Sequence, residues 1–344
     1  GTGSRLRPIT FSMAKQLVPV ANKPILFYGL EDLAEAGIEE VGIIIAPQTG
    51  DEIRRTVGNG DRFGLRIEYI VQDEPLGLAH ALKTALPFVD GDDVLMYLGD
   101  NLVKQGVADV VRDFKSDRPN CQILLTKVDD PSQFGVAELG AAGEVVRLVE
   151  KPSSPRSDLA LVGVYLFDNS VVEAVNSIQP SARGELEITD AIQYLVTSGR
   201  DVRPSLVTGW WKDTGKKEDL LHANELVLSD LVEDIQSEVI GGSMRGTVCI
   251  GAGSRVVDCD ITGPVVIGAN VHLVRTTIGS NTGIGDGCRL ADANLEESIV
   301  LDDAEIHGWT LRNSLIGRGA ELHGSAPAGF VEVTLGERSE ILGE

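Results

Sequence analysis

A repeated apolar-glycine pair restricts what the last third of this chain can fold into more than any other feature. Isoleucine precedes glycine at positions 250, 267, 278, 284 and 316, and aliphatic residues lie between these pairs at 256, 261, 273 and 290. The intervals lie near multiples of six, with slips of about one residue that turns absorb. This rhythm is typical of a parallel β-helix, in which each coil buries its apolar side chains on the next. A β-sandwich remains an alternative because residues 291–314 are irregular.

The first two thirds of the chain alternate strand-like and helix-like segments. Short runs rich in β-branched residues begin at 41, 65, 94 and 121, and segments with helical spacing lie between them. This alternation predicts an α/β domain of the Rossmann-like class, with a mostly parallel sheet and helices on both faces. An amphipathic segment over 216–235 would connect the two parts. We therefore expect one domain over 1–235 and a second over 236–344, with ligands beyond the carboxyl ends of the strands.

Charge and cysteine content limit the possible partners. The formal net charge of -22 argues against nucleic acid or an anionic membrane as a partner. The chain has no run of 18 apolar residues and opens without a signal segment. Its four cysteines lack metal-ligand spacing, so we expect them to be small buried side chains. We therefore expect a cytoplasmic protein with no nucleic-acid or membrane partner.

The N-terminal segment is a local exception to the acidic balance. The first carboxylate of the chain is Glu31, whereas Arg5, Arg7, Lys15 and Lys23 all precede it. Glycines at positions 1 and 3 would let backbone amides approach a phosphate, and a guanidinium can bind two oxygens at once. The loop GTGSRL completes neither the dinucleotide fingerprint nor a Walker A motif. Several cations without a nearby carboxylate predict a bound anion.

Two aspartates stand out by their context. Asp100 ends the apolar run VLMYLGD, at the carboxyl edge of an expected strand, and Asp213 lies in the turn WWKDTG. Either could simply cap local structure: Asp100 a turn, and Asp213 the helix expected from about Lys216. Their separation along the chain leaves open whether they meet. If they meet beside a polyphosphate, a hard divalent cation such as Mg²⁺ is expected between them.

Eight motifs carry a resemblance to a known family. They are GTGSRLRPIT, AKQLVPVANKP, QDEPLGLAHAL, YLGDN, FGVAEL, VEKP, RGELEITDAIQ and WWKDTG, in that order. At these intervals the chain resembles the sugar-phosphate nucleotidylyltransferases, over about residues 1–230. The tail resembles the left-handed β-helix of the long members of that family. The resemblance thus implies a Rossmann-like nucleotidyltransferase domain followed by a left-handed parallel β-helix.

The resemblance implies a Mg²⁺-dependent reaction between dTTP and α-D-glucose 1-phosphate, as in the thymidylyl-transferring members. The sugar phosphate would attack the α-phosphorus and pyrophosphate would leave, so the site needs cations more than an acid or a base. Arg5 would stabilise the leaving pyrophosphate, and Lys15 would hold phosphate charge. Asp100 and Asp213 would bind the metal. The loop around the triphosphate would comprise Gly1, Thr2, Gly3 and Ser4.

The same resemblance assigns substrate contacts. Gln72 would contact the pyrimidine edge with its two-sided amide, and Gly77 would leave room for the base. Glu185 could be a site residue or equally an acid in the first turn of a helix, so its role stays open. The sugar-phosphate side would comprise Gly135, Glu150, Lys151 and, through its backbone, Leu161.

Other functions remain possible. UTP or another sugar 1-phosphate would suit the same chemistry. A bifunctional enzyme could carry an acetyltransferase site on the tail, with His307 or His323 as its base. A non-catalytic regulatory subunit would be expected to have lost Arg5, Lys15 or an aspartate, and all of these are present. We favour a structural tail that supports a homo-oligomer.

The N-terminus departs from the family pattern. Family members carry an apolar strand ending in Ala-Gly-Gly directly before the glycine loop, and this chain begins without it. Because such a strand would be central in the sheet, we expect an additional preceding segment of about ten residues. An intact mass matching only 36.7 kDa would contradict this expectation.

Overall fold

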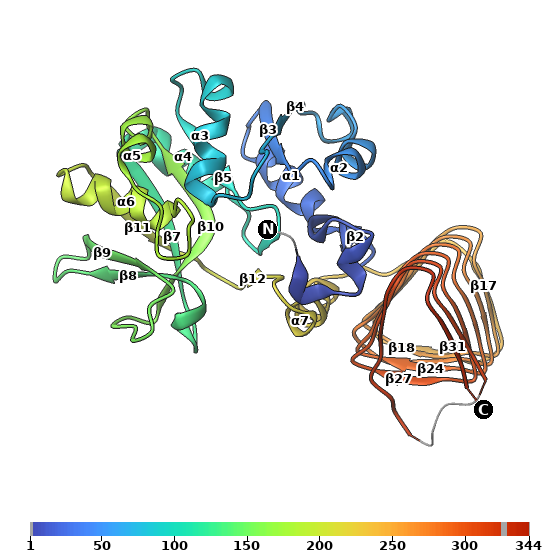
Figure 1. Ribbon diagram of the computed structural model, residues 1–344. Helices are drawn as coiled ribbons and strands as arrows, with labels where there is room; N and C mark the ends of the chain where they lie inside the picture. The colour runs from blue at the N-terminus through green and yellow to red at the C-terminus, as the bar shows by residue number, and fades with distance from the viewer. Residues whose placement is uncertain (1–2, 325–328, 344) are drawn as a thin grey trace. The chain divides into compact units, whose positions relative to one another are not determined.

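The computed structural model of this chain describes residues 3–324 and 329–343, which form two compact units (Figure 1). The first unit comprises residues 26–213. The second combines the N-terminal segment up to Ile25 with the chain from Thr214 onward. The basic N-terminal segment therefore belongs to the same compact unit as the C-terminal tail. The domain boundary expected near residue 235 stays a prediction.

The first unit contains a six-stranded sheet with the order β11-β7-β10-β8-β9, in which β5 also pairs with β10. β7 and β11 are parallel, whereas β10 runs antiparallel to β5, β7 and β8. Four strands therefore share one direction, and β9 and β10 oppose it. The expected α/β class is confirmed. The strands are β5 (Val94–Tyr97), β7 (Cys121–Lys127), β8 (Gly135–Leu139), β9 (Val145–Glu150), β10 (Leu159–Phe167) and β11 (Val202–Leu206).

Two strand pairs and six helices complete this unit. β3 (Glu40–Ile45) and β4 (Arg66–Val71) are parallel, and β6 (Asn101–Val103) and β12 (Trp211–Asp213) are antiparallel. The helices are α1 (Ile25–Glu35), α2 (Gly50–Val57), α3 (Leu78–Val89), α4 (Ala108–Asp117), α5 (Val171–Ser177) and α6 (Ile188–Thr197). Short 3-10 turns lie at Asp61–Phe63 and Pro131–Gln133.

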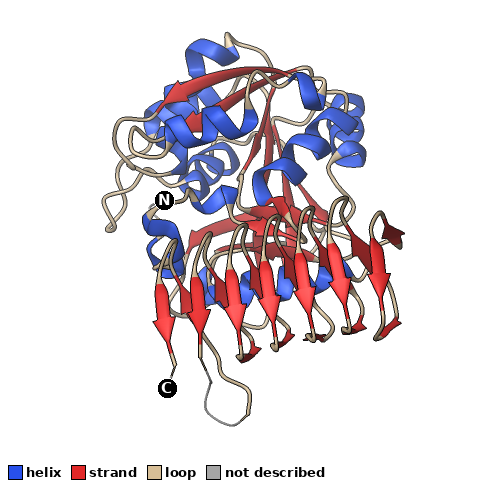
Figure 2. Ribbon diagram, turned by 90° about the vertical axis from the view of Figure 1, so that its right-hand side faces the viewer, coloured by secondary structure: helices blue, strands red, loops and turns tan. Residues whose placement is uncertain are grey.

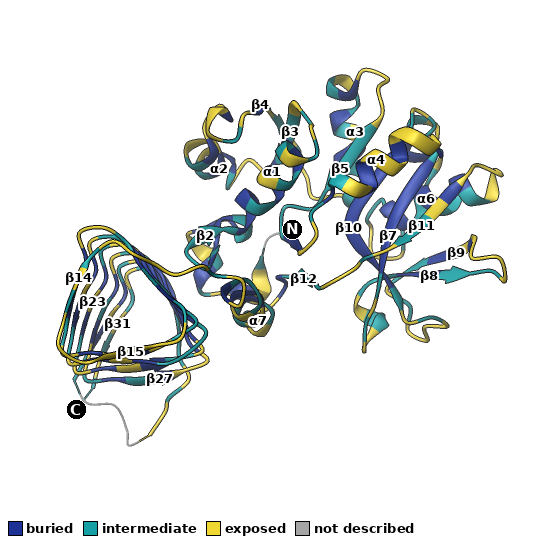
Figure 3. Ribbon diagram, turned by 180° about the vertical axis from the view of Figure 1, so that it is seen from behind, coloured by how far each residue is buried: buried dark blue, intermediate teal, exposed yellow. Residues whose placement is uncertain are grey.

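The centre of the sheet is covered on both faces. β10 is buried from Ala160 through Phe167, and Figure 3 shows the strand as continuously buried. Its odd-numbered residues, such as Tyr165, share a core with α6, whereas its even-numbered residues, such as Val164, share another core with α4. Alternate side chains of a strand point to opposite faces, so an unbroken apolar run serves both layers.

The second unit begins with the basic segment. It forms 3-10 turns at Ser4–Leu6, Ile9–Phe11 and Lys15–Leu17, followed by a hairpin of β1 (Pro19–Val20) and β2 (Lys23–Pro24). Helix α7 (Lys217–Leu228) is shorter than the amphipathic segment that the sequence predicts. The side chain of Asp219 accepts a hydrogen bond from the Lys216 amide at the start of α7, over 3.1 Å. Asp213 instead belongs to β12, so its predicted alternative as the cap of this helix is wrong.

The tail is a three-sided parallel β-helix, as Figure 1 shows end-on and Figure 2 from the side. One face holds β13 (Asp234–Ile235), β16 (Val248–Ile250), β19 (Val265–Ile267), β22 (Thr282–Ile284), β25 (Ile299–Val300), β28 (Leu315–Ile316) and β30 (Thr334–Leu335). The second holds β14 (Glu238–Ile240), β17 (Arg255–Val257), β20 (His272–Val274), β23 (Arg289–Ala291), β26 (Glu305–His307), β29 (Glu321–His323) and β31 (Glu340–Leu342). The third holds β15 (Ser243–Arg245), β18 (Asp260–Thr262), β21 (Thr277–Ile278), β24 (Asn294–Glu296) and β27 (Thr310–Arg312).

The β-helix, called the coil below, repeats every 17 residues in its first turns and every 16 residues in the following turns, and its last turn spans 19 residues. Val256, Leu273, Leu290 and Ile306 consequently stack on one another inside the coil. Corners of the coil take left-handed backbone conformations, which asparagine, aspartate and glycine adopt most easily. A repeat of 17 or 16, one or two short of three hexapeptides, explains the slips in the sequence rhythm. The irregular stretch over 291–314 also forms coil, so the β-sandwich alternative is wrong.

The structure bears on two further expectations. Cys121, Cys259 and Cys288 are buried free thiols, as expected, whereas Cys249 is only partly buried. Burial raises the pKa of the Cys288 thiol to about 12. Among the helices of the described ranges, none combines the length and apolarity that a membrane crossing requires. The cytoplasmic location stays a prediction.

Candidate active site

Strand pairing brings the two candidate metal-binding aspartates together. Asp100 directly precedes β6, and Asp213 is the last residue of β12. Because β6 and β12 are antiparallel, Asp213 lies opposite Asn101, the neighbour of Asp100. The Oδ1 atom of Asp213 is buried. The structure thus joins two residues that sequence spacing could not connect.

Asn101 orients Asp100. The side chain is 3% exposed, and its amide nitrogen donates a hydrogen bond to Oδ1 of Asp100 over 3.0 Å. Its amide oxygen accepts from the indole of Trp211 over 2.6 Å and from the backbone of Gly163 over 3.2 Å. A Cβ atom on Gly163 would lie 2.7 Å from that oxygen, so the close approach requires glycine. The sequence reasoning missed Asn101, although it follows Asp100 directly in YLGDN.

Three carboxylates influence the charge state of one buried phenol, that of Tyr165. Burial raises the pKa of Tyr165, and the charges of Glu150, Asp100 and Asp213 raise it further. The two aspartates and Glu150 therefore all act electrostatically on the same buried side chain. Such a concentration of negative charge favours a bound cation. Asp100 and Asp213 suit Mg²⁺, which commonly takes one or two protein carboxylates and completes its shell with water and substrate phosphates.

The residues expected on the sugar side also converge. Gly135 and Glu150 are partners in the β8-β9 register. A Cβ atom on Gly135 would lie 2.7 Å from Cγ2 of Thr189, 3.2 Å from a carboxylate oxygen of Glu150 and 3.3 Å from a methyl carbon of Leu161. Thr189 donates a hydrogen bond to Glu150 over 3.3 Å. Glycine therefore leaves the space in which these three side chains meet, and Thr189 joins the set that the sequence predicted.

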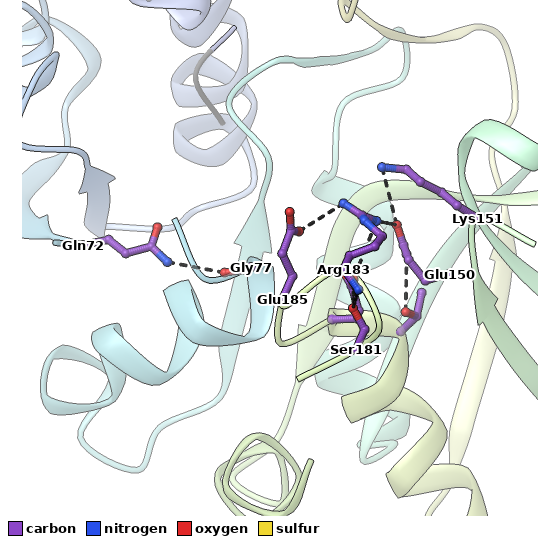
Figure 4. Close-up of polar contacts among 9 residues, drawn as sticks. Gln72, Gly77, Glu150, Lys151, Ser181, Arg183 and Glu185 are labelled. Carbon is purple, nitrogen blue, oxygen red and sulfur yellow. Dashed lines mark hydrogen bonds and ion pairs between the residues drawn. The ribbon is translucent and has the colours of Figure 1, made fainter. Parts of the chain in front are cut away.

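Arg183 links the carboxylates of this side, as Figure 4 shows. Its guanidinium lies 3.2 Å from Glu150, 3.1 Å from Glu185 and 3.6 Å from Glu187. Burial opposes the charge of Arg183, but these carboxylates outweigh it and raise its pKa. Lys151 approaches the same oxygen of Glu150 at 3.8 Å. Two cations thus flank Glu150 where a sugar phosphate is expected.

Neither Glu185 nor Glu187 lies inside helix α6. Helix α6 begins at Ile188, with Glu187 as its cap residue, so Glu185 lies before the first turn. Glu185 is therefore not an acid of the first helical turn, which was one of the two interpretations that the sequence left open. Glu187 is 4% exposed, and burial raises the pKa of its carboxyl, although a hydrogen bond of 2.8 Å from Ser181 opposes the change.

The amide of Gln72 is held in one orientation at the start of α3 (Figure 4). Its nitrogen donates to the carbonyl of Gly77 over 3.4 Å and lies 2.9 Å from Nδ1 of His80. With His80 as the acceptor, both amide hydrogens are used and the amide oxygen is left for a ligand. The contact of Gln72 with a pyrimidine edge stays a prediction. The sequence reasoning found no ligand role for His80, and here the side chain orients Gln72.

Backbone pairing joins the base side to the sugar side. Leu186 donates to the carbonyl of Leu76 over 2.7 Å, and its own carbonyl accepts from Ala79 over 3.0 Å. Gly77 lies between these bonds with φ of 106°, and a Cβ atom there would lie 2.4 Å from the Leu186 oxygen. Gly77 is therefore needed for the contact between the QDEPLG and GELEIT motifs, beyond any room that it leaves for a base.

From Gly3 onward, the glycine loop belongs to the second unit. Gly1 and Thr2 lie outside the described residues. Gly3 has a φ of 62°, and its carbonyl accepts from the hydroxyl of Thr10 over 2.7 Å. A Cβ atom on Gly3 would lie 3.3 Å from Cβ of Lys15, so the loop packs against the backbone end of that lysine. Ser4 and Arg5 are exposed.

A cavity of about 540 Å³ lies between β9 and α6. Glu150, Glu187 and Asp190 are among the residues that line it, and burial raises the pKa of the Asp190 carboxyl. Neither candidate metal ligand lines the cavity. The cavity therefore borders the carboxylate network without containing the aspartate pair.

The histidines considered as acetyltransferase bases lie on the outside of the coil. His307 is 3.5 Å from a carboxylate oxygen of Asp292, and His323 is 3.2 Å from one of Glu321. In the described part of the chain, no group of three or more histidine, cysteine, aspartate or glutamate side chains is arranged to hold a metal ion.

Comparisons with known proteins identify the family of this chain. The family model "Nucleotidyl transferase" matches residues 1–230. A glucose-1-phosphate thymidylyltransferase of Streptomyces griseus is 49% identical over 334 residues, which cover 95% of this chain and 92% of the relative. A low-salt glycan biosynthesis nucleotidyltransferase of Haloferax volcanii is 43% identical over 99% of this chain and 97% of its own length. A solved structure from Bacillus anthracis, provisionally assigned as a glucose-1-phosphate thymidylyltransferase, has a TM-score of 0.63 and 35% identity, over 68% of this chain and 94% of its own.

Proposed function

Because this chain belongs to the nucleotidyl transferase family, we propose that it transfers a thymidylyl group from dTTP to α-D-glucose 1-phosphate. A phosphate oxygen of the sugar phosphate forms a bond to the α-phosphorus, and the bond from that phosphorus to pyrophosphate breaks. The products are dTDP-glucose and pyrophosphate. The antiparallel pairing that sets Asp213 opposite Asn101, the neighbour of Asp100, carries the proposal, because it supports a shared role for the two candidate metal ligands.

Sugar recognition would rest on the convergent set around Gly135. Glu150, already oriented by Thr189 and Arg183, would accept hydrogen bonds from sugar hydroxyls. The open space at Gly135 would admit the ring, and Leu161 would border it. Lys151 would hold the sugar phosphate by its charge.

Base recognition would depend on the acceptor that Gln72 presents. A thymine or uracil ring carries an N–H at position 3, which can donate to an amide oxygen, whereas cytosine carries an acceptor there. With both amide hydrogens of Gln72 engaged by Gly77 and His80, only its amide oxygen is left for a base. Because N3 of cytosine is also an acceptor, it could not form a hydrogen bond with that oxygen. This arrangement supports dTTP or UTP over CTP.

Charge compensation would come from basic side chains and a bound cation. Arg5 would stabilise the leaving pyrophosphate, Lys15 would hold phosphate charge, and the loop from Gly1 through Ser4 would wrap the triphosphate. Asp100 and Asp213 would hold Mg²⁺, which when bound neutralises phosphate charge. The role of the protein is mainly positioning and electrostatic stabilisation, as expected for phosphoryl-type transfer.

Product identification tests this proposal. The purified chain is incubated with dTTP, glucose 1-phosphate and Mg²⁺, and the sugar nucleotide is identified by mass spectrometry. We expect a product with the mass of dTDP-glucose and an equal amount of pyrophosphate, both lost when a chelator removes the divalent cation. Pyrophosphate without the sugar nucleotide would indicate hydrolysis of dTTP and contradict the proposal.

A further inference from the structure

The tip of the β1-β2 hairpin contacts the coil through a small polar junction within the second unit. Val20 pairs with Lys23, so Ala21 and Asn22 form a two-residue turn, with φ values of 47° and 62°. Positive φ at both positions matches a type I′ turn, which fixes the hairpin tightly. This hairpin follows directly on the 3-10 turn that begins at Lys15.

Three hydrogen bonds hold the junction. The amide oxygen of Asn224 in α7 accepts from the Ala21 backbone over 2.8 Å, and its nitrogen donates to the carbonyl of Asn281 in the coil over 2.9 Å. Asn22 donates to the carbonyl of Ile284 over 2.6 Å. The side chain of Asn224 is fully buried, so both ends of a buried amide are satisfied by this bridge.

The coil makes room for the junction. Gly283 lies in β22 between the two acceptor carbonyls, and a Cβ atom there would lie 3.3 Å from the Asn22 side chain and 3.5 Å from that of Asn224. A second contact lies elsewhere on the coil, where a Cβ atom on Gly336 would be 3.2 Å from Cβ of Pro8. The coil therefore meets the basic segment on either side of Lys15 in sequence.

Hydrogen bonds continue from the junction to the candidate phosphate-binding lysine. The Ile25 amide, just past the hairpin, donates to the carbonyl of Val18 over 3.2 Å, and the Val18 amide donates to the carbonyl of Lys15 over 3.2 Å. Gly3 in turn packs against Lys15. The position of the hairpin tip on the coil thus limits where the lysine and the glycine loop can lie.

We propose that the β-helix is the anchor that positions the phosphate-binding segment, with Asn224 and Asn22 as positioning residues that join the segment to the coil. The catalytic consequence rests on the proposed function, whereas the anchoring itself does not. The tail is then a working part of the catalytic machinery, in addition to any role in self-association. Displacing groups that hold phosphates by even an ångström costs rate, so a loosened anchor lowers activity without removing any phosphate contact.

Point variants of the full chain test the anchor. Asn224→Leu keeps the branched shape of the side chain and removes both hydrogen bonds, whereas Asn22→Ala removes one bond from a half-buried side chain and is the milder change. Asn294→Ala is the matched control, because this asparagine lies exposed on the coil and its side chain bonds only locally, to Thr310 over 3.2 Å.

Hydrogen exchange followed by mass spectrometry gives the readout that needs no activity. We expect the peptide covering residues 16–25 to exchange about tenfold faster in both variants, because local opening becomes easier, with no change in the control. Unchanged exchange in Asn22→Ala and Asn224→Leu would overturn the anchor. If Asn224→Leu fails to fold, the Asn22→Ala comparison alone decides.

Steady-state kinetics separates a positioning role from a purely structural one. We expect kcat/KM for dTTP to fall about tenfold in Asn224→Leu, because the phosphate-binding segment is misplaced. The KM for glucose 1-phosphate should stay within about twofold, because its binding residues belong to the other unit. Faster exchange with unchanged dTTP kinetics would overturn the positioning role. A wild-type chain that makes no dTDP-glucose contradicts the proposed function, and the exchange experiment still decides the anchoring.

Discussion

The C-terminal coil and the candidate site of the first unit are built by opposite rules. In the β-helix, interior side chains stack on residues 17 or 16 positions away, or 19 in the last turn, and the same contact is repeated along one axis. In the site, the pairing of β6 with β12 brings Asp213 beside the neighbour of Asp100, and Glu150 ends β9 in a different sheet. The difference teaches that repetition provides stability here, whereas chemistry depends on contacts that occur once.

The largest expected effect is a loss of activity from a substitution that leaves the fold intact. Replacing Asp100 with alanine removes a candidate metal ligand, and we expect kcat to fall about a thousandfold. The matched change in the coil is Asp292→Ala, which removes a surface carboxylate bound to Arg275. That variant should retain wild-type activity. Pyrophosphate release measures both, and equal activity in the two variants would contradict the metal assignment.

A core substitution in the coil should instead lower the stability of the protein. Leu290 is 1% exposed and stacks between Leu273 and Ile306. Leu290→Ala should cost about 3 kcal/mol of unfolding free energy, from lost burial and the remaining cavity. Because each coil contacts mainly its neighbours, faster hydrogen exchange should be confined to the adjacent coils. Exchange that rises equally throughout the first unit would contradict this local behaviour.

A single methyl group tests how tightly the sugar side is packed. Gly135→Ala would place Cβ 2.7 Å from Thr189 and 3.2 Å from Glu150, so one of them must move. We expect the KM for glucose 1-phosphate to rise about tenfold, which corresponds to about 1.4 kcal/mol of binding free energy. The KM for dTTP, measured in the same reactions, serves as the internal control. A variant with both constants unchanged would show that the space at Gly135 is not used by the sugar.

The smallest expected effect concerns pH. Burial raises the pKa of Glu187 in the folded chain, so the folded state keeps this proton to a higher pH than the unfolded state does. Its contribution to stability is therefore fully present below the ordinary glutamate pKa of about 4.3 and is lost as pH rises through the folded value. Glu187→Gln should remove this part of the decline. Urea unfolding of both proteins at a series of pH values measures the difference, and parallel pH curves would contradict it.

Much of the fold was predictable because its signals are local. The strand-helix alternation and the apolar-glycine rhythm each repeat within a few residues, and both classes are confirmed. The reversed direction of β10 was not predictable, because an unbroken apolar run looks the same in either direction. The coil period was also missed, since repeats of 17 and 16 blur a pattern of six.

Candidate site residues could be predicted from the sequence only where they match a family motif. Gly135, Glu150 and Leu161 converge as the family resemblance implies, but the pairing of Asp100 with Asp213 depends on β6 and β12. Other members have no local signature: Asn101, Arg183 and Thr189 act through partners distant in sequence. His80 likewise acquires its role only because Gln72 lies beside it.

The most direct test of the central claim is a nucleotide panel with two proteins. Wild type and Asp213→Ala are each given glucose 1-phosphate, Mg²⁺ and one of dTTP, UTP, GTP, CTP or ATP at equal concentration, and pyrophosphate release is timed. The account predicts fast release with dTTP, little with CTP, and loss of both in Asp213→Ala. Full activity in Asp213→Ala, or a wild type that prefers CTP or a purine nucleotide, would contradict it.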